Sequence, residues 1–106
     1  MNKLLWIAAC AALLASGPAL AANPVAGQEK AKTCAACHGA DGNSAAPDFP
    51  RLAGQNFDYL VKALSDYKAG ERKNVIMAPQ AANLSQRDIE DLAAYFSRQH
   101  GLVVKY

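Results

Sequence analysis

Apolar residues recur at helical spacing in two long segments of the chain. From position 57 onward, helical spacing relates Phe57, Leu60, Val61, Leu64 and Tyr67, and Gly70 follows as a helix stop. In the second segment, Ile89, Leu92, Ala93 and Phe96 share one helical face, with Tyr95 beside it and Gly101 after the end. The pattern predicts two amphipathic helices in the second half of the chain.

The start of the last helix carries the clearest signal. Ser85 and Asp88 fit the S-x-x-D pattern of a capping box, and Leu84 and Ile89 stand where a hydrophobic staple is expected. Between the two long helices lies the segment from Glu71 to Asn83. We expect it to be a loop that carries Met77 and is closed by Pro79.

The region before these helices predicts one short helix and then a loop. A helix can begin after Pro24 and run past Lys32 toward Cys34. From Gly39 to Gly54 the chain is interrupted by turn-forming residues, namely Gly42, Asn43, Ser44, Pro47 and Pro50. Since alanine far outnumbers valine, isoleucine and threonine, we expect an all-α domain.

The first 21 residues have a different pattern. Asn2 and Lys3 give a short positive start, residues 4 to 14 are almost uninterruptedly apolar, and Ala19-Leu20-Ala21 supplies the small residues of a signal-peptidase site at its first and third positions. The apolar run is too short for a membrane span, which needs about 20 residues. We therefore expect residues 1–21 to be a cleaved signal peptide and residues 22–106 to form a single domain in the periplasm, without a stable membrane anchor. Acylation at Cys10 is less favoured, because the apolar run continues past it.

Composition and charge argue against two classes of function, nucleic-acid binding and electrostatic membrane binding. The chain has 106 residues and a formal net charge of +2, and one of its lysines lies in the expected leader. This is neither the basic footprint of a nucleic-acid-binding protein nor a polybasic membrane patch. A domain of this size often relies on a disulfide, a metal or another staple.

The chemistry is concentrated in the run Cys34-Ala35-Ala36-Cys37-His38. This is the C-x-x-C-H pattern of covalent haem attachment, in which each sulfur adds to a vinyl group and the histidine binds iron. Three other interpretations are less favoured. A thioredoxin-like dithiol usually follows a strand, a zinc site lacks a second C-x-x-C, with only His100 as a distant helper, and a plain disulfide leaves His38 unexplained.

Met77 is the only methionine after the expected leader. A thioether far from the cysteines suits the sixth position of an electron-transfer haem and raises its potential. An isolated methionine is otherwise more often a core residue. His100 is the other candidate ligand, although it lies just beyond a helix end.

With these motifs in view, the chain resembles the bacterial class I cytochromes c, most closely one half of the periplasmic dihaem cytochromes c and their short single-haem relatives. The motifs that carry the resemblance are Cys34 to Gly39, Asp41-Gly42-Asn43-Ser44, Leu52-Ala53-Gly54-Gln55 with Tyr59-Leu60, the Met77 segment, and Leu84-Ser85 leading into Ala93-Ala94-Tyr95-Phe96.

The resemblance implies a small fold in which helices wrap around one covalently attached haem. It implies that the first and last helices cross, with Gly27 close to Tyr95 and Phe96. It also implies a proline carbonyl that accepts the proton of the proximal histidine. Pro47 matches that position, and Pro50 is the nearby competitor.

The function expected from these features is one-electron transfer through haem iron bound by His38 and Met77, without catalysis by the chain itself. Expected partners are transient redox proteins such as a membrane cytochrome complex, an oxidase or a reductase, and the protein is expected to be a monomer. The alternative is a haem-bearing electron-transfer subunit of a periplasmic dehydrogenase or sulfur-oxidising complex. A haem sensor with a labile Met77 is a second alternative.

Overall fold

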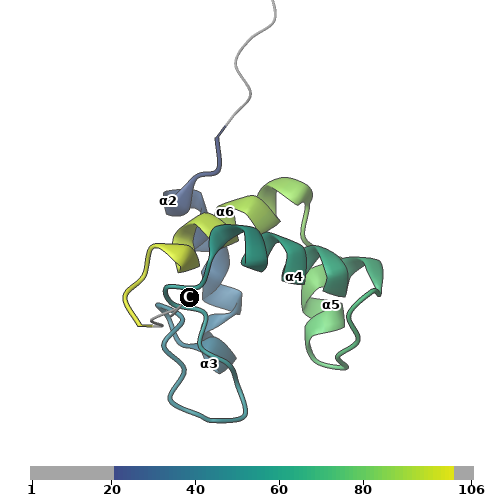
Figure 1. Cartoon of the computed structure of the whole chain (residues 1–106), viewed down its shortest axis with the longest axis horizontal. Coiled ribbons are helices and arrows are strands. Elements are labelled where there is room, and N and C mark those ends of the chain that lie inside the picture. Colours follow the sequence, from purple (N-terminus) through teal and green to yellow (C-terminus); the bar gives the residue numbers. More distant parts are fainter. Residues whose placement is uncertain (1–20, 102–106) are drawn as a thin grey trace, which may run out of the picture.

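The computed structural model describes residues 21–101, and within them every regular element is helical (Figure 1). The elements are α2 (Pro24–Lys30), the 3-10 turn η1 (Ala31–Thr33), α3 (Ala35–His38), α4 (Phe57–Ala69), α5 (Met77–Ala82) and α6 (Gln86–Ser97). The all-α prediction is confirmed. The predicted leader, residues 1–21, lies outside the described residues except for its last alanine. In the described part of the chain, no helix has the length and apolar character to cross a membrane.

The starts of both long helices and the end of α4 agree with their sequence signals, whereas α6 ends at Ser97, several residues before Gly101. The Ser85 hydroxyl accepts from the backbone N–H of Asp88 at 3.0 Å, and the Asp88 carboxylate accepts from that of Ser85 at 2.9 Å. The predicted capping box is thus formed. Gly70 ends α4 in the left-handed region, with φ of 79°, a conformation that side chains disfavour.

The first and last helices cross at very close range. A Cβ atom added to Gly27 would lie 1.9 Å from the carbonyl oxygen of Asp91 and 2.9 Å from the Cβ of Tyr95. Only glycine allows this approach. The crossing was predicted against Tyr95 and Phe96, whereas the nearest atoms belong to Asp91 and Tyr95.

A buried carboxylate joins the two crossing helices. Asp91 is 1% exposed and accepts from the backbone N–H of Asn23 at 2.8 Å and from the Lys30 ammonium at 2.7 Å. Arg87 lies 3.5 Å away, and Lys30 also pairs with Asp88 at 2.9 Å. Burial by itself raises the pKa of Asp91, but the hydrogen bonds from Lys30 and Asn23 outweigh it and hold that pKa below its usual value.

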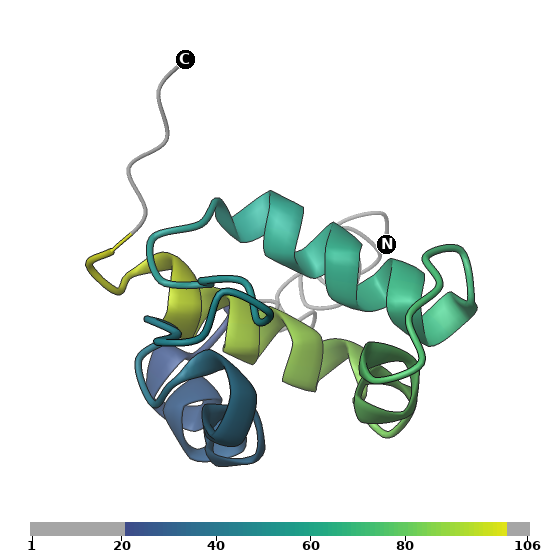
Figure 2. The ribbon, with the colours of Figure 1, turned by 90° about the horizontal axis from the view of Figure 1, so that it is seen from below.

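Helix α4 packs along α6, and α5 packs against α4 (Figure 2). The core is therefore shared between α6 and α4, with one residue from η1. Its buried members are Ala31, Leu60, Leu92, Ala93, Tyr95 and Phe96. The Tyr95 and Phe96 rings meet edge to face at a centroid distance of 5.1 Å.

Two predicted element bounds are wrong. The first helix does not run on to Lys32: α2 ends at Lys30, and the chain tightens into η1 before Cys34. The segment around Met77 is not a loop, because Met77 is the first residue of α5 and Pro79 lies within that helix. Proline is tolerated there because the N–H groups of a helix's first turn have no partner within the helix.

Candidate functional site

A cavity of about 460 Å³ opens among α3, α4, α5, α6 and the loop before α4. This volume lies within the range typical of small-molecule and cofactor sites. One wall comes from core side chains of α6, and an adjacent wall comes from α4. These wall residues are Leu60, Ala63, Leu64, Tyr67, Leu92, Ala93 and Phe96.

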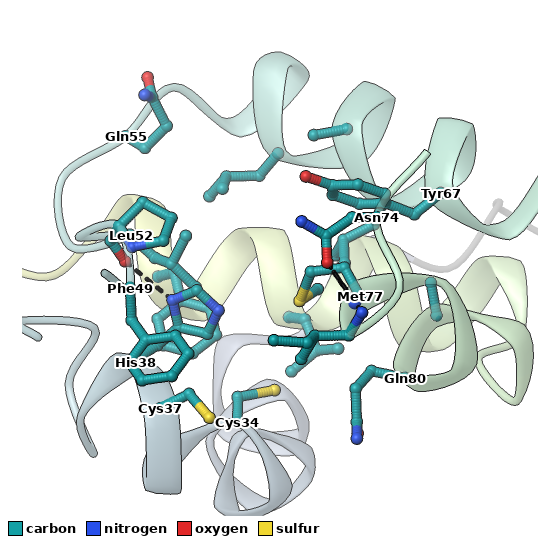
Figure 3. A pocket seen from close by; sticks show the side chains of 18 of the residues that line it. Cys34, Cys37, His38, Phe49, Leu52, Gln55, Tyr67, Asn74, Met77 and Gln80 are labelled. Atoms are coloured by element: carbon teal, nitrogen blue, oxygen red, sulfur yellow. Dashed lines mark hydrogen bonds between the residues drawn. The ribbon is translucent and has the colours of Figure 1, made fainter. Parts of the chain in front are cut away.

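The C-x-x-C-H segment forms one end of the cavity (Figure 3). Residues 35–38 make a single helical turn, in which the N–H of His38 donates to the carbonyl of Cys34 at 2.9 Å. This turn directs both cysteines and the histidine to the same space. The Cys34 and Cys37 thiols are free, with no disulfide between them.

The environment of Cys34 argues against a redox-active dithiol. Burial raises the pKa of its thiol, although the Thr33 hydroxyl works in the opposite direction. A dithiol that exchanges disulfides needs a lowered thiol pKa instead. The zinc interpretation also finds no support: within residues 21–101, no three His, Cys, Asp or Glu side chains gather as metal ligands.

His38 is buried, and its orientation is set by a backbone carbonyl. Its Nδ1 lies 2.8 Å from the carbonyl oxygen of Pro50. The prediction that Pro47 supplies this carbonyl is wrong. With Nδ1 donating to Pro50, the other ring nitrogen faces the cavity as an acceptor, as Figure 3 shows.

The path of the loop explains why the acceptor is Pro50. The N–H groups of Leu52 and Ala53 both donate to the carbonyl of Gly42, at 2.8 and 3.2 Å, which turns the chain back on itself. Ser44 is buried and donates within the same loop to the carbonyl of Ala46 at 3.0 Å. These bonds bring Pro50, next to the closure, over His38. Pro47 and Pro50 are both exposed, so the closure of the loop beside Pro50, rather than burial, decides which carbonyl His38 contacts.

The predicted sixth ligand, Met77, lies across the cavity from His38. In Figure 3 its sulfur points into the space that the free nitrogen of His38 also faces. The two side chains come from opposite sides of the fold, one on α3 and one at the start of α5. His100, the alternative ligand, is exposed and is not part of the cavity wall.

Sequence reasoning missed several polar residues of the cavity wall, among them Arg72 and Asn74. Arg72 donates to the Tyr59 hydroxyl at 3.2 Å, and its guanidinium lies 4.9 Å from the centre of the Tyr67 ring. Asn74 accepts from the backbone N–H groups of Ile76 and Met77, at 2.9 Å each. Asn74 stands shortly before the start of α5, and asparagine is a preferred residue for capping a helix start. This signal was not used, because residues 71–83 were predicted to be a loop.

These residues fit a haem as a group. Two free thiols lie at one end of an apolar cavity, and a histidine with one ring nitrogen already engaged faces a thioether across it. The walls offer carbon surface for a flat macrocycle, and the thiols offer covalent attachment. A small polar ligand would leave the apolar walls in contact with water and therefore fits the cavity less well.

Comparison with known proteins agrees with this chemistry. Residues 24–99 match the family model described as cytochrome c. The chain belongs to the cytochrome c family. Members of this family carry haem c, an iron porphyrin bonded covalently to the polypeptide.

Among its relatives, cytochrome c4 of Pseudomonas aeruginosa is 51% identical over 93% of this chain and 49% of its own length. Cytochrome c-554(548) of Halomonas halodenitrificans is 45% identical over 74% of this chain and 99% of its own length. A protein of Stutzerimonas stutzeri named thiosulfate dehydrogenase electron acceptor is 43% identical over 89% of this chain and 47% of its own length. The chain thus spans about half the length of the cytochrome c4 relatives it matches.

The fold agrees with the sequence match. The crystal structure of reduced cytochrome c4 from Pseudomonas stutzeri superposes with a TM-score of 0.74 at 50% identity. The match covers 78% of this chain and 48% of the other. This cytochrome therefore has the class I all-α fold that its sequence resemblance implies.

Proposed function

We propose that this cytochrome is an electron carrier whose haem is bonded to Cys34 and Cys37 and whose iron is bound by His38 and Met77. The observation that carries the proposal is the arrangement across the cavity. His38 is held by the Pro50 carbonyl at 2.8 Å, and its free nitrogen faces the Met77 sulfur. The haem supplies a reversible one-electron change at iron. The chain's part would be to hold the iron through His38 and Met77 and to keep the site dry.

Two protein ligands on the iron would favour electron transfer over catalysis. An iron that holds two protein ligands has no open position for a substrate, and a thioether ligand favours the reduced state. Docking to redox proteins, such as a membrane cytochrome complex, an oxidase or a reductase, is then brief and small in area. In this role the chain acts as a monomer.

Attachment is tested by extraction with acidic organic solvent. Haem bonded to Cys34 and Cys37 stays with the denatured polypeptide, whereas a non-covalent haem leaves with the solvent. The double variant Cys34→Ala/Cys37→Ala should lose haem and remain mostly unfolded, because the cavity walls lose the surface they pack against. A well-folded double variant without haem would contradict this account.

Ligation is tested with Met77→Ala. The oxidised protein should lose its weak sulfur-to-iron charge-transfer band, the reduced protein should bind carbon monoxide, and the midpoint potential should fall. The fold should change less, since the haem stays attached through two thioethers. His100→Ala is the matched control, because that side chain is exposed and outside the cavity. If His100→Ala produced these changes and Met77→Ala did not, the ligand assignment would be wrong.

We further propose that the protein is exported to the periplasm after removal of residues 1–21. Support comes from the positive start, the short apolar run and the small residues that follow it. N-terminal sequencing of exported protein should then begin at or near Ala22. A mature chain that begins with an acylated Cys10 would exclude this leader.

A second candidate function is that of an electron-transfer subunit in a sulfur-oxidising or dehydrogenase complex. The observation that favours it is the similarity to a protein named thiosulfate dehydrogenase electron acceptor. The two functions differ in assembly rather than in the haem site. Size-exclusion chromatography of native extract distinguishes them, since a free carrier elutes at its own mass and a subunit elutes with a catalytic chain.

A further inference from the structure

The residues before Met77 are held in an unusual way for such an exposed part of the chain. All six residues from Glu71 to Ile76 are exposed. Within them, the Asn74 side-chain oxygen accepts from the backbone N–H of Ile76 and from that of Met77, each at 2.9 Å. The Asn74 carbonyl accepts from the N–H of Ala78, also at 2.9 Å. Asn74 therefore accepts three hydrogen bonds at the start of α5, one from Ile76 just before the helix and two from its first two residues.

This cap is coupled to the cavity through its position. Met77 is the first residue of α5, so the cap fixes the backbone of the residue whose sulfur enters the cavity. Figure 3 shows Asn74 beside Met77, with a dashed line that joins its side-chain oxygen to the Met77 backbone. Pro79 cannot donate a backbone hydrogen bond, which leaves the first turn of α5 more dependent on its cap.

We propose that Asn74 is a positioning residue for Met77: its cap holds the first turn of α5 in the conformation that presents the sulfur to the haem iron. The proposal rests on ligation by Met77, as proposed above. Release of the sulfur requires the backbone at the start of α5 to move. The cap opposes that movement, because both N–H groups would lose their acceptor.

The same chain offers a matched control for loss of a helix cap. The Asn23 side-chain oxygen accepts from the N–H groups of Val25 and Ala26 at 2.9 and 3.2 Å, and its carbonyl accepts from that of Gly27 at 3.0 Å. This is the same pattern, placed at the start of α2 and away from the cavity wall. Removing either cap should cost similar stability, but only Asn74 should affect the sixth position.

The test is the apparent affinity of imidazole for the oxidised holoprotein, followed by the visible spectrum. Imidazole binds only when the sulfur has left, so its apparent affinity scales with the fraction of protein in the open state. Loss of a cap of ordinary strength should raise that fraction, and hence the affinity, about five- to tenfold in Asn74→Ala. Asn74→Asp keeps the acceptor oxygen and should stay within about twofold of the wild type. Asn23→Ala should bind imidazole as the wild type does.

The outcomes separate this proposal from ligation itself. Unchanged imidazole affinity in Asn74→Ala, or an equal rise in Asn23→Ala, would overturn the positioning role. So would an Asn74→Asp variant that binds as tightly as Asn74→Ala. Met77→Ala is the reference for a fully open site. If Met77→Ala bound imidazole no more tightly than the wild type, the proposed ligation by Met77 would be refuted, whatever the effect of the cap.

Discussion

The crossing of α2 and α6 gives a sharp stability prediction for Gly27→Ala. The new Cβ atom would lie 1.9 Å from the Asp91 carbonyl oxygen, whereas an ordinary contact needs at least 3.4 Å. The obstacle is backbone, so it cannot rotate away. The helices have to separate, which disturbs the packing of Tyr95 and weakens the hydrogen bonds that Asp91 accepts from Lys30 and Asn23.

The expected change in the free energy of unfolding of Gly27→Ala is the sum of three contributions. Overpacking of a tight contact costs about 1–3 kcal/mol, and a weakened hydrogen bond to a charged group costs about 1 kcal/mol more. Replacing glycine by alanine inside a helix stabilises the helix by about 1 kcal/mol. The net loss is about 2 kcal/mol, which lowers the melting temperature of a domain this small by about 10 °C.

Thermal unfolding of the holoprotein, followed by far-ultraviolet circular dichroism, measures this loss. Gln28→Ala is the control, because Gln28 is exposed on the same helix and its replacement alters helix propensity without adding a contact. It should shift the melting temperature by only a degree or two. A Gly27→Ala variant as stable as the wild type would show that the helices do not approach as closely as described.

Two further predictions concern the same helices. The Lys30 ammonium and the Ser85 N–H lower the pKa of Asp88 to about 2, and Lys30 also lowers that of Asp91 against the effect of burial. Both carboxylates therefore contribute stability that is present above their unfolded pKa, near 3.9, and is lost as the pH falls through their lowered folded pKa, which for Asp88 is about 2. Denaturant unfolding across that range should show the loss, and Lys30→Gln should reduce it. Tyr95→Phe removes the bond from its hydroxyl to the Ala40 carbonyl, at 2.8 Å, and should cost about 1 kcal/mol in denaturant unfolding. Because Tyr95 is not part of the cavity wall, its role should be structural only, and the visible spectrum of the holoprotein should not change. An altered visible spectrum in Tyr95→Phe would contradict that role.

Local signals in the sequence were sufficient for the long helices. The Ser85 and Asp88 capping box and the Gly70 stop each depend on residues within one turn of the helix end, so spacing alone identifies them. The C-x-x-C-H run is equally local. Its single helical turn brings Cys34, Cys37 and His38 to one space without any distant contact.

Contacts between distant segments account for the errors. The acceptor for His38 depends on the closure of the loop by Gly42 with Leu52 and Ala53, about ten residues away, so matching the chain to the family's proline position favoured the wrong proline. Asp91 was missed for a similar reason. A charged residue on an amphipathic helix normally faces solvent, and only the crossing of α2 over α6 buries it.

The bond from His38 to Pro50 has a consequence for how this protein can vary. Its acceptor is a main-chain oxygen, which every amino acid at position 50 would also provide. No amino-acid substitution at position 50 removes the acceptor oxygen itself. Variation can reach it only indirectly, by redirecting the loop at sites such as Gly42, where φ is 85° and an added Cβ would lie 2.8 Å from the Ala53 nitrogen. The orientation of the histidine is thus protected from mutation at the contact and exposed to mutation at the turn that supports it.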